Sequence, residues 1–191
     1  MMFFVTGANG VGKTTCIPEL RRLLPGVAIH DFDEGGVPVD VDVAWRHRTT
    51  EHWLRRGIEN EREERHTAIC GGALLGEILA CPSALELSQI EVCLLDVHDV
   101  ELVDRLESRG TRATQDALSW AAWQRLHAVD PQWHPAVIRT HSAPHMRWER
   151  WADWQRGDAR WRVHSIDTTG LEVTEVAQRV FDWISGCLIG A

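Results

Sequence analysis

The sequence has no tyrosine, and Lys13 is its single lysine among twenty Lys and Arg residues. An excess of basic charge is also absent. The net charge is -8, which excludes a general nucleic-acid surface, since such a surface needs a positive field. The apolar run at residues 1–5 is too short for a signal-peptide core or a membrane span. We therefore expect a cytoplasmic protein with no nucleic-acid or membrane partner.

Paired cysteines are lacking as well. The five cysteines are odd in number and widely spaced, and no Cys-x-x-Cys or Cys/His pattern at zinc spacing occurs. These features predict buried, reduced thiols rather than a disulfide framework or a zinc site.

The 191 residues suit one α/β domain with its own core. Apolar, β-rich runs alternate with helical stretches, which predicts parallel strands joined by crossover helices. The strands are expected at 2–6, 27–32, 66–70, 91–96 and 161–166. The helices are expected at 13–24 (kinked at Pro18), 43–65 (as one or two helices), 73–79, 99–108, 114–129, 142–155 and 173–184. The sequence thus predicts a single domain over 1–191, with a five-stranded parallel sheet and helices on both faces.

A complete Gly-x-x-x-x-Gly-Lys-Thr pattern lies between the first expected strand and the first expected helix. Glycines let the backbone curl so that successive N–H groups point at phosphate oxygens. Lys13 can reach the β- and γ-phosphates, and the Thr14 hydroxyl can ligate Mg²⁺. The pattern predicts an ATP·Mg²⁺ site made of Gly7, Asn9, Gly10, Val11, Gly12, Lys13, Thr14 and Thr15.

Three aspartates follow expected strands, where open α/β sheets place their ligands. Asp33 is the candidate for orienting an accepting hydroxyl as a general base, against the alternative of a helix cap or loop residue. Asp31 either holds Mg²⁺ through water or caps a turn. Asp96 fits an apolar strand ending in a metal-binding aspartate, but also a buried strand that ends at a turn. We rank it below Asp31.

Arg105, Arg109 and Arg112 lie on the end of the helix at 99–108 and the following turn. A guanidinium can bond two phosphate oxygens at once, which suits a lid over a transferring phosphoryl group. The alternative is a solvated helix face that pairs with neighbouring carboxylates. We favour the lid role, and hence catalysis, for Arg109 and Arg112, and leave Arg105 open.

Tryptophans recur at i, i+3 spacing between residues 120 and 154. This spacing favours packing between two helices over a stacking platform for a ligand. Trp45 and Arg46 follow the second strand and are candidates for substrate contact.

The ordered segments resemble the P-loop kinase branch that includes shikimate kinase, gluconate kinase, chloramphenicol phosphotransferase and adenylate kinase. The resemblance rests on His30-Asp31-Phe32-Asp33, Cys70-Gly71-Gly72, the strand-and-helix run 92–109, and Val163 to Gly170. It implies substrate contacts at Gly71 and Gly72 and an adenine-side loop at Asp167 and Thr168. It also implies a helical lid and substrate cap at about 105–160, although 113–160 is longer and richer in tryptophan than the lid of shikimate kinase.

The expected reaction is transfer of the ATP γ-phosphoryl group to a hydroxyl or phosphate of a small molecule. The acceptor is left open among a sugar acid, an antibiotic and a nucleotide. Ras-type GTPases are excluded, because their Asn-Lys-x-Asp segment needs a second lysine. The rival hypotheses are a regulatory module that hydrolyses ATP slowly and a degenerate kinase that binds ATP without transfer.

Overall fold

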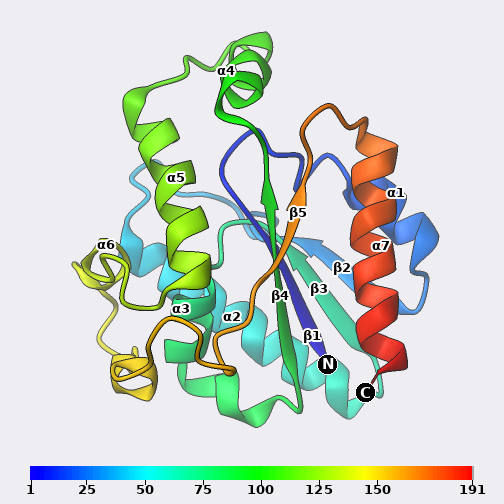
Figure 1. Ribbon diagram of the computed structural model, residues 1–191. Helices are drawn as coiled ribbons and strands as arrows, with labels where there is room; N and C mark the ends of the chain where they lie inside the picture. Colours follow the sequence, from blue (N-terminus) through cyan, green and yellow to red (C-terminus); the bar gives the residue numbers. More distant parts are fainter. Residues whose placement is uncertain (191) are drawn as a thin grey trace.

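The computed structural model describes residues 1–190, and its five strands form one all-parallel sheet (Figure 1). The strands are β1 (Met2–Thr6), β2 (Val27–Asp31), β3 (His66–Cys70), β4 (Ile90–Asp96) and β5 (His164–Asp167). Their order is β2-β3-β1-β4-β5, so β1 lies at the centre between β3 and β4. The prediction of a five-stranded parallel sheet is confirmed.

Helices cover both faces of this sheet. They are α1 (Ile17–Leu23), α2 (Val43–Arg62), α3 (Leu75–Ala80), α4 (Asp99–Ser108), α5 (Gln115–Val129), α6 (Ala136–Arg139) and α7 (Val173–Ile189), with two 3-10 turns, η1 (Pro82–Glu86) and η2 (Trp148–Trp151). Within residues 1–190, no helix has both the length and the apolar character needed to cross a membrane.

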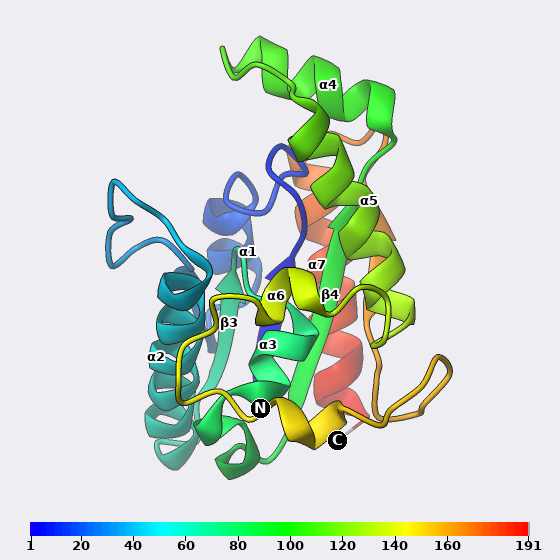
Figure 2. The same ribbon diagram turned by 90° about the vertical axis from the view of Figure 1, so that its left-hand side faces the viewer.

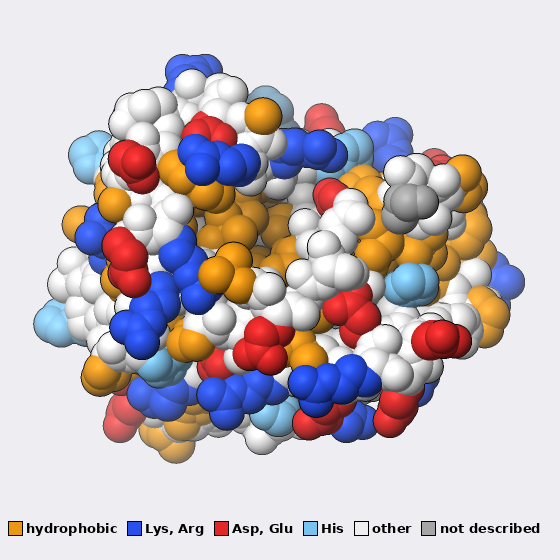
Figure 3. Space-filling view, turned by 90° about the horizontal axis from the view of Figure 1, so that it is seen from below, with side chains coloured by type: hydrophobic (Ala, Val, Ile, Leu, Met, Phe, Trp, Pro, Cys, Tyr) orange, Lys and Arg blue, Asp and Glu red, His pale blue; other side chains and the backbone are white. Residues whose placement is uncertain are grey.

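Two separate cores form because successive side chains of a strand point to opposite faces. Phe3 and Val5 of β1 pack in one core with residues of α1 and α7, and Met2 and Phe4 pack in the other with residues of α2 and α3. Figure 2 shows α2 and α7 on opposite sides of the strands. On the face seen in Figure 3, acidic and basic side chains are interspersed around a hollow with a hydrophobic floor.

The first helix begins later than the sequence predicted. It was expected at 13–24 with a kink at Pro18, but α1 starts at Ile17, so that Pro18 lies in its first turn. Proline has no N–H to donate, and the first turn is the part of a helix where that donor is not needed. Residues 13–16 form turns instead, with Cys16 N donating to Gly12 O.

The predicted helix at 142–155 is also wrong, because only η2 is helical there. Two of the i, i+3 tryptophans, Trp123 and Trp151, donate from their indole N–H to backbone carbonyls elsewhere in the chain, while Trp148 donates to the Ser142 hydroxyl. The indole N–H of Trp151 donates to Gly76 O at 2.9 Å, and that of Trp161 donates to His127 O at 2.9 Å. Because Trp161 is buried in this way, β5 starts at His164 and not at residue 161. The tryptophans do pack as predicted, but not as two facing helices.

The bounds of the other elements differ by a few residues. Strand β2 ends before Phe32, α3 starts two residues later and ends one residue later than expected, α2 is one helix, and α7 continues to Ile189.

His127 lies at the centre of the tryptophan-rich core. Its ring stacks on Trp123 with centroids 4.5 Å apart and meets the edges of Trp151 and Trp161 at 6.0 and 5.1 Å. The side chain is 3% exposed, and this burial lowers the pKa of His127 from 6.5 to about 4. The packing therefore requires the neutral imidazole.

This arrangement predicts an acid-sensitive stability. Because the pKa is lower in the folded state, the unfolded chain binds the proton first, and stability falls as the pH drops from about 6.5 toward 4. Between pH 7.5 and 5.5 the wild type should lose about 1 kcal/mol more than His127→Phe, which keeps an aromatic ring but cannot titrate. Urea unfolding at the two pH values measures this difference. Equal losses in the two proteins would show that His127 does not cause the effect.

Candidate active site

The phosphate loop follows β1 at the carboxyl edge of the sheet. Gly7, Gly10 and Gly12 have φ values of 144°, 93° and 105°, a region that residues with a side chain rarely adopt. A Cβ on Gly7 would also lie 2.4 Å from Leu95 O of the neighbouring strand. The glycines are therefore required by the course of the loop along β4.

The loop leaves its backbone donors unused. Among residues 1–190, no acceptor in the protein takes a hydrogen bond from the N–H groups of residues 9–15. Backbone N–H groups that are neither exposed to bulk water nor paired are costly, and a concave row of them is suited to bind an anion. The geometry therefore fits a phosphate chain, as the sequence predicted.

Lys13 spans the mouth of this loop. Its Nζ donates to Gly7 O and Ala8 O, both at 2.7 Å. Burial lowers the pKa of Lys13 to about 8, while the carboxylates of Asp33 and Asp31 act in the opposite direction. The ammonium group thus lies between the loop and the two aspartates.

A hollow of 450 Å³ opens beside the loop and brings together most of the predicted site. It is lined by Gly7, Asn9, Gly10, Gly12, Lys13, Thr14, Thr15, Asp31, Phe32, Asp33, Val41, Trp45, Arg46, Gly71, Gly72, Leu106, Arg109, Thr111, Trp120 and Gln124. We call it the acceptor hollow. Trp120 and Gln124 were not predicted as site residues, because the i, i+3 spacing of Trp120 and Trp123 favoured packing and Gln124 belongs to no motif.

Asp31 and Asp33 lie at the end of β2 and differ in their bonding. Asp31 Oδ1 accepts a hydrogen bond from Asp33 N at 3.0 Å, so Asp31 caps the turn, which was one of its two predicted roles. The pKa of Asp33 is raised by partial removal from water and by Asp31, against the lowering effect of Lys13. A raised pKa suits a group that accepts a proton near neutral pH.

Gly71 has a structural reason to be glycine. A Cβ at this position would lie 2.0 Å from the Cβ of Phe32, where β2 ends beside β3. Gly72 has more room, since its nearest neighbour would be Arg46 Cδ at 3.9 Å.

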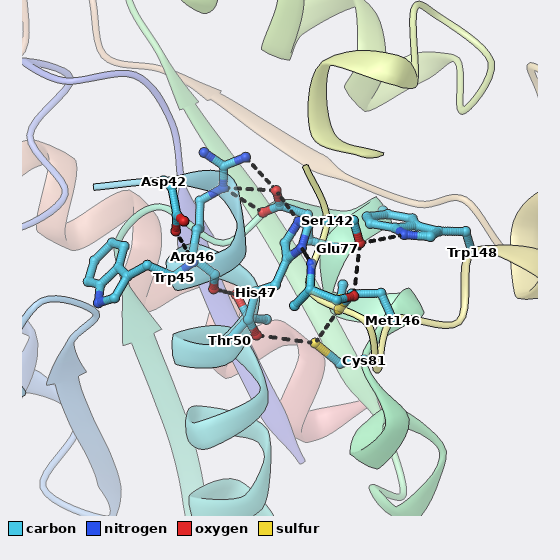
Figure 4. A network of polar contacts seen from close by, with 12 residues as sticks. Asp42, Trp45, Arg46, His47, Thr50, Glu77, Cys81, Ser142, Met146 and Trp148 are labelled. Atoms are coloured by element: carbon cyan, nitrogen blue, oxygen red, sulfur yellow. Dashed lines mark hydrogen bonds and ion pairs between the residues drawn. The ribbon is translucent and has the colours of Figure 1, made fainter. Parts of the chain in front are cut away.

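Arg46 is held by a buried carboxylate that the sequence analysis did not identify. Its Nε and Nη2 donate to Glu77 at 2.5 to 2.9 Å, and Glu77 is fully buried (Figure 4). His47 Nδ1 accepts from Ala143 N at 3.2 Å, which leaves Nε2 to donate to Glu77 at 3.2 Å. The lone glutamate within the apolar run of α3 is the signal that could have indicated this network.

A second hollow, of 370 Å³, lies on the other side of the loop and shares Gly10, Gly12, Thr15 and Arg109 with the first. It is lined by Gly10, Val11, Gly12, Thr15, Glu101, Arg105, Ser108, Arg109, Gly170, Leu171, Glu172, Val173 and Val176. We call it the nucleoside hollow, because Gly170, at the end of the segment that the resemblance places on the adenine side, lines it.

The predicted adenine-side residues are shifted relative to this hollow. Thr168 is fully buried, and its hydroxyl donates to Asp96 O at 2.9 Å, while Asp167 Oδ1 accepts from Thr169 N. Neither lines the hollow, whereas the next residues, from Gly170 to Val173, do. Arg105 does line it, and its Nη2 bridges Glu101 Oε1 at 2.5 Å and Thr168 O at 2.7 Å.

The two lid arginines are placed differently. Arg109 is at the carboxyl end of α4, lines both hollows, and donates from Nη2 to the Thr15 hydroxyl at 3.3 Å. Arg112 is exposed on the segment between α4 and α5 and lines neither hollow. Figure 2 shows α4 at the top of the molecule, near the phosphate loop.

Mg²⁺ is the metal that the sequence predicts at this site. No group of three or more His, Cys, Asp or Glu residues suited to a metal occurs within residues 1–190. Mg²⁺ fits the site nonetheless, because it is commonly held by one or two protein oxygens together with phosphates and water, and Thr14 and Asp31 both line the acceptor hollow. Asp96 does not line it and lies 3.8 Å from Arg125.

A larger depression of 850 Å³ lies between α6 and η2. It shares no residue with the phosphate loop, and we do not assign it to the site.

No protein-family model matches the sequence, and no curated protein matches it either. Solved structures do. The tunicamycin resistance protein of Deinococcus radiodurans is 15% identical, with 96% of this chain and 94% of that chain covered and a TM-score of 0.56. Shikimate kinase from Aquifex aeolicus is 15% identical, with 100% of both chains covered and a TM-score of 0.55. Shikimate kinase from Acinetobacter baumannii, solved with shikimate, is 15% identical over 97% and 93%, with a TM-score of 0.51.

Likeness at this level of identity shows the fold. The chain therefore has the P-loop kinase fold, and its resemblance to the small-molecule branch of these kinases is confirmed at the level of the fold.

The placement of Arg109 generates a prediction. Arg109→Ala should weaken the binding of Mg·ATP at least about tenfold, because the guanidinium lies where the two hollows meet at the loop. Arg56→Ala is the matched control, since Arg56 is an exposed arginine that pairs with Glu59 away from the loop. Isothermal titration calorimetry measures the Mg·ATP affinity of both variants and of the wild type. Equal affinities in the two variants would remove Arg109 from the nucleotide site.

Proposed function

We propose that this protein is an ATP- and Mg²⁺-dependent phosphotransferase that moves the γ-phosphoryl group to a small molecule. The observation that carries the proposal is the meeting of two hollows at one phosphate loop, with Asp33 on the side away from the nucleoside. A protein that only hydrolyses ATP needs no second hollow of 450 Å³ beside the γ-phosphate position.

The residues divide the work between holding charge and orienting the acceptor. The loop N–H groups, Lys13 and Arg109 supply positive charge around the transferring group, which is where phosphoryl transfer gains most of its rate. ATP supplies the phosphoryl group, and Thr14 and Asp31 would hold a Mg²⁺ ion that would screen the charge of the phosphates. Asp33 accepts the hydroxyl proton of the acceptor and keeps the oxygen in line for attack.

We extend the proposal to the arrangement of the chain. Residues 1–191 form a single kinase-like domain in which the segment at about 105–160 serves as lid and substrate cap. Arg112 then reaches the phosphates only when the segment after α4 moves toward the loop.

Asp33→Asn tests the proposal. The amide keeps the size of the side chain but cannot accept the proton, so ATP·Mg²⁺ affinity should stay within about twofold of wild type while transfer falls by roughly 10² or more. Asp40→Asn is the matched control, because Asp40 is an exposed aspartate of the same loop that does not line the hollow. Calorimetry and a coupled ADP-release assay give the two readouts.

A regulatory ATPase predicts a different result. Its slow hydrolysis would be unchanged in Asp33→Asn, because no acceptor hydroxyl has to be oriented. Unchanged transfer to an identified acceptor would exclude Asp33 and leave Asp31 as the candidate base. Loss of ATP binding would show that Asp33 holds the metal or the fold.

A further inference from the structure

The charges that line the acceptor hollow fall into two groups. Lys13 and Arg109 belong to the phosphate loop, where the proposed function already uses them. Away from the loop, the charged lining residues are Asp31, Asp33 and Arg46. Arg46 is therefore the one cation among the lining residues that an anionic acceptor could use.

The charge of Arg46 is already balanced. Its guanidinium makes three contacts of 2.5 to 2.9 Å with Glu77, which is fully buried. Burial by itself raises the pKa of Glu77, but Arg46 and His47 outweigh it and hold the pKa below its ordinary value, so the carboxylate stays charged. A carboxylate or phosphate on the acceptor would then meet a neutral pair and two nearby aspartates.

The same pair still offers a hydrogen-bond donor. The bonds to Glu77 use Nε and Nη2, and within residues 1–190 no protein acceptor takes a hydrogen bond from Nη1 of Arg46. The guanidinium also lies over the Trp120 ring, 5.3 Å from its centroid, which fixes its orientation. Figure 4 shows Arg46 turned toward Glu77, with Trp45 beside it on α2.

A neutral polar group completes the wall. Gln124 is 4% exposed and lines the hollow, and its Oε1 has no hydrogen-bond partner within the described part of the chain. Gln124 Nε2 makes no hydrogen bond within the described part of the chain either, and it is the more accessible end of the amide, so the side chain can offer a ligand a neutral donor or, with the amide turned, an acceptor.

The remaining wall is aromatic and rigid. Trp120 stacks on Trp123 with centroids 5.1 Å apart and planes 10° from parallel, and Trp45 meets Phe32 edge-on at 5.9 Å. Both Trp45 and Trp120 line the hollow. Because Trp123 and Arg46 already lie against the Trp120 ring, Trp45 offers the freer indole surface for a flat ring.

We propose that the acceptor is an uncharged alcohol that carries a planar ring, and not a carboxylate or a phosphate. This inference rests on the proposed function and narrows its substrate class. The step forms a bond between the alcohol oxygen and the γ-phosphorus and breaks the bond to the bridging oxygen. Its products are a phosphate monoester, ADP and the proton taken by Asp33.

Two sets of matched probe compounds test the proposed class of acceptor. The first is phenyl β-glucoside, phenyl β-glucuronide and methyl β-glucoside, in which the second compound has a carboxylate in place of the primary alcohol and the third lacks the planar ring. The second is uridine, UMP and ribose, which vary the same two properties. Binding is measured by quenching of tryptophan fluorescence in the presence of Mg·ADP, and transfer by ADP release from Mg·ATP. We expect phenyl β-glucoside and uridine each to bind at least tenfold more tightly than the other two compounds of the same set.

Glu77→Gln tests the cause of the preference. Without the carboxylate, the charge of Arg46 is unbalanced, so the affinity for phenyl β-glucuronide should rise at least tenfold relative to the affinity for phenyl β-glucoside. Gln124→Leu leaves the ion pair of Arg46 and Glu77 in place. It should lower the affinity for uridine at least fivefold without changing the preference for neutral probes. Thermal melts identify folded variants, and Gln124→Leu keeps the test open if Glu77→Gln does not fold.

The outcomes separate the two proposals. Tighter binding by the anionic or ringless members, or no difference within either set, overturns the assignment of the acceptor class. ADP release with an anionic acceptor would overturn this inference while supporting the phosphotransferase. Binding of the neutral ring probes with no phosphate ester formed on any compound would count against the phosphotransferase and leave the class of ligand standing.

Discussion

The structure depends on one constraint, which is that the N–H groups of residues 9–15 have no acceptor within the described chain. Such a row persists only where the backbone is forced into shape, and here the positive φ values of Gly7, Gly10 and Gly12 force it, with Gly7 pressed against Leu95 O of β4. The central position of β1 places the loop at the edge where β2, β3 and β4 also end. The carboxylates of β2 and the Arg-bearing end of α4 are therefore brought to the same point.

The charges around that point are arranged unequally. The side nearest the loop carries Lys13 and Arg109, while the far side of the acceptor hollow carries an arginine balanced by buried Glu77 and two indole rings. The positive charges of Lys13 and Arg109 thus lie at the loop with Asp31 and Asp33 beside them, and the pair of Arg46 and Glu77 adds no net charge farther out. Under the proposed function, this arrangement would stabilise charge where it changes during transfer and leave recognition of the acceptor to shape and neutral hydrogen bonds.

The sequence was sufficient for the sheet, for the glycine-rich turn after β1 and for the grouping of Asp33, Trp45, Arg46 and Arg109 around it, because strand alternation and a complete local motif report directly on geometry. It was insufficient where long-range contacts decide the local structure. Trp151 and Trp161 bond to carbonyls of Gly76 and His127, and these bonds replace the predicted helix at 142–155. Glu77 was not identified as a site residue because its partner Arg46 is 31 residues away. A pairing at that separation leaves no periodic signal.

Whether residues 7–14 hold the phosphates of ATP is decided by calorimetric titration of Mg·ATP into wild type, Lys13→Ala and Lys13→Arg. We expect binding in the wild type and at least a hundredfold loss of affinity in both variants. Alanine removes the charge, and the bulkier planar guanidinium of arginine cannot act as a compact point charge in the loop. Circular dichroism should show both variants folded. Affinity in Lys13→Ala equal to that of the wild type would contradict the assignment of the phosphate loop and, with it, the proposed reaction.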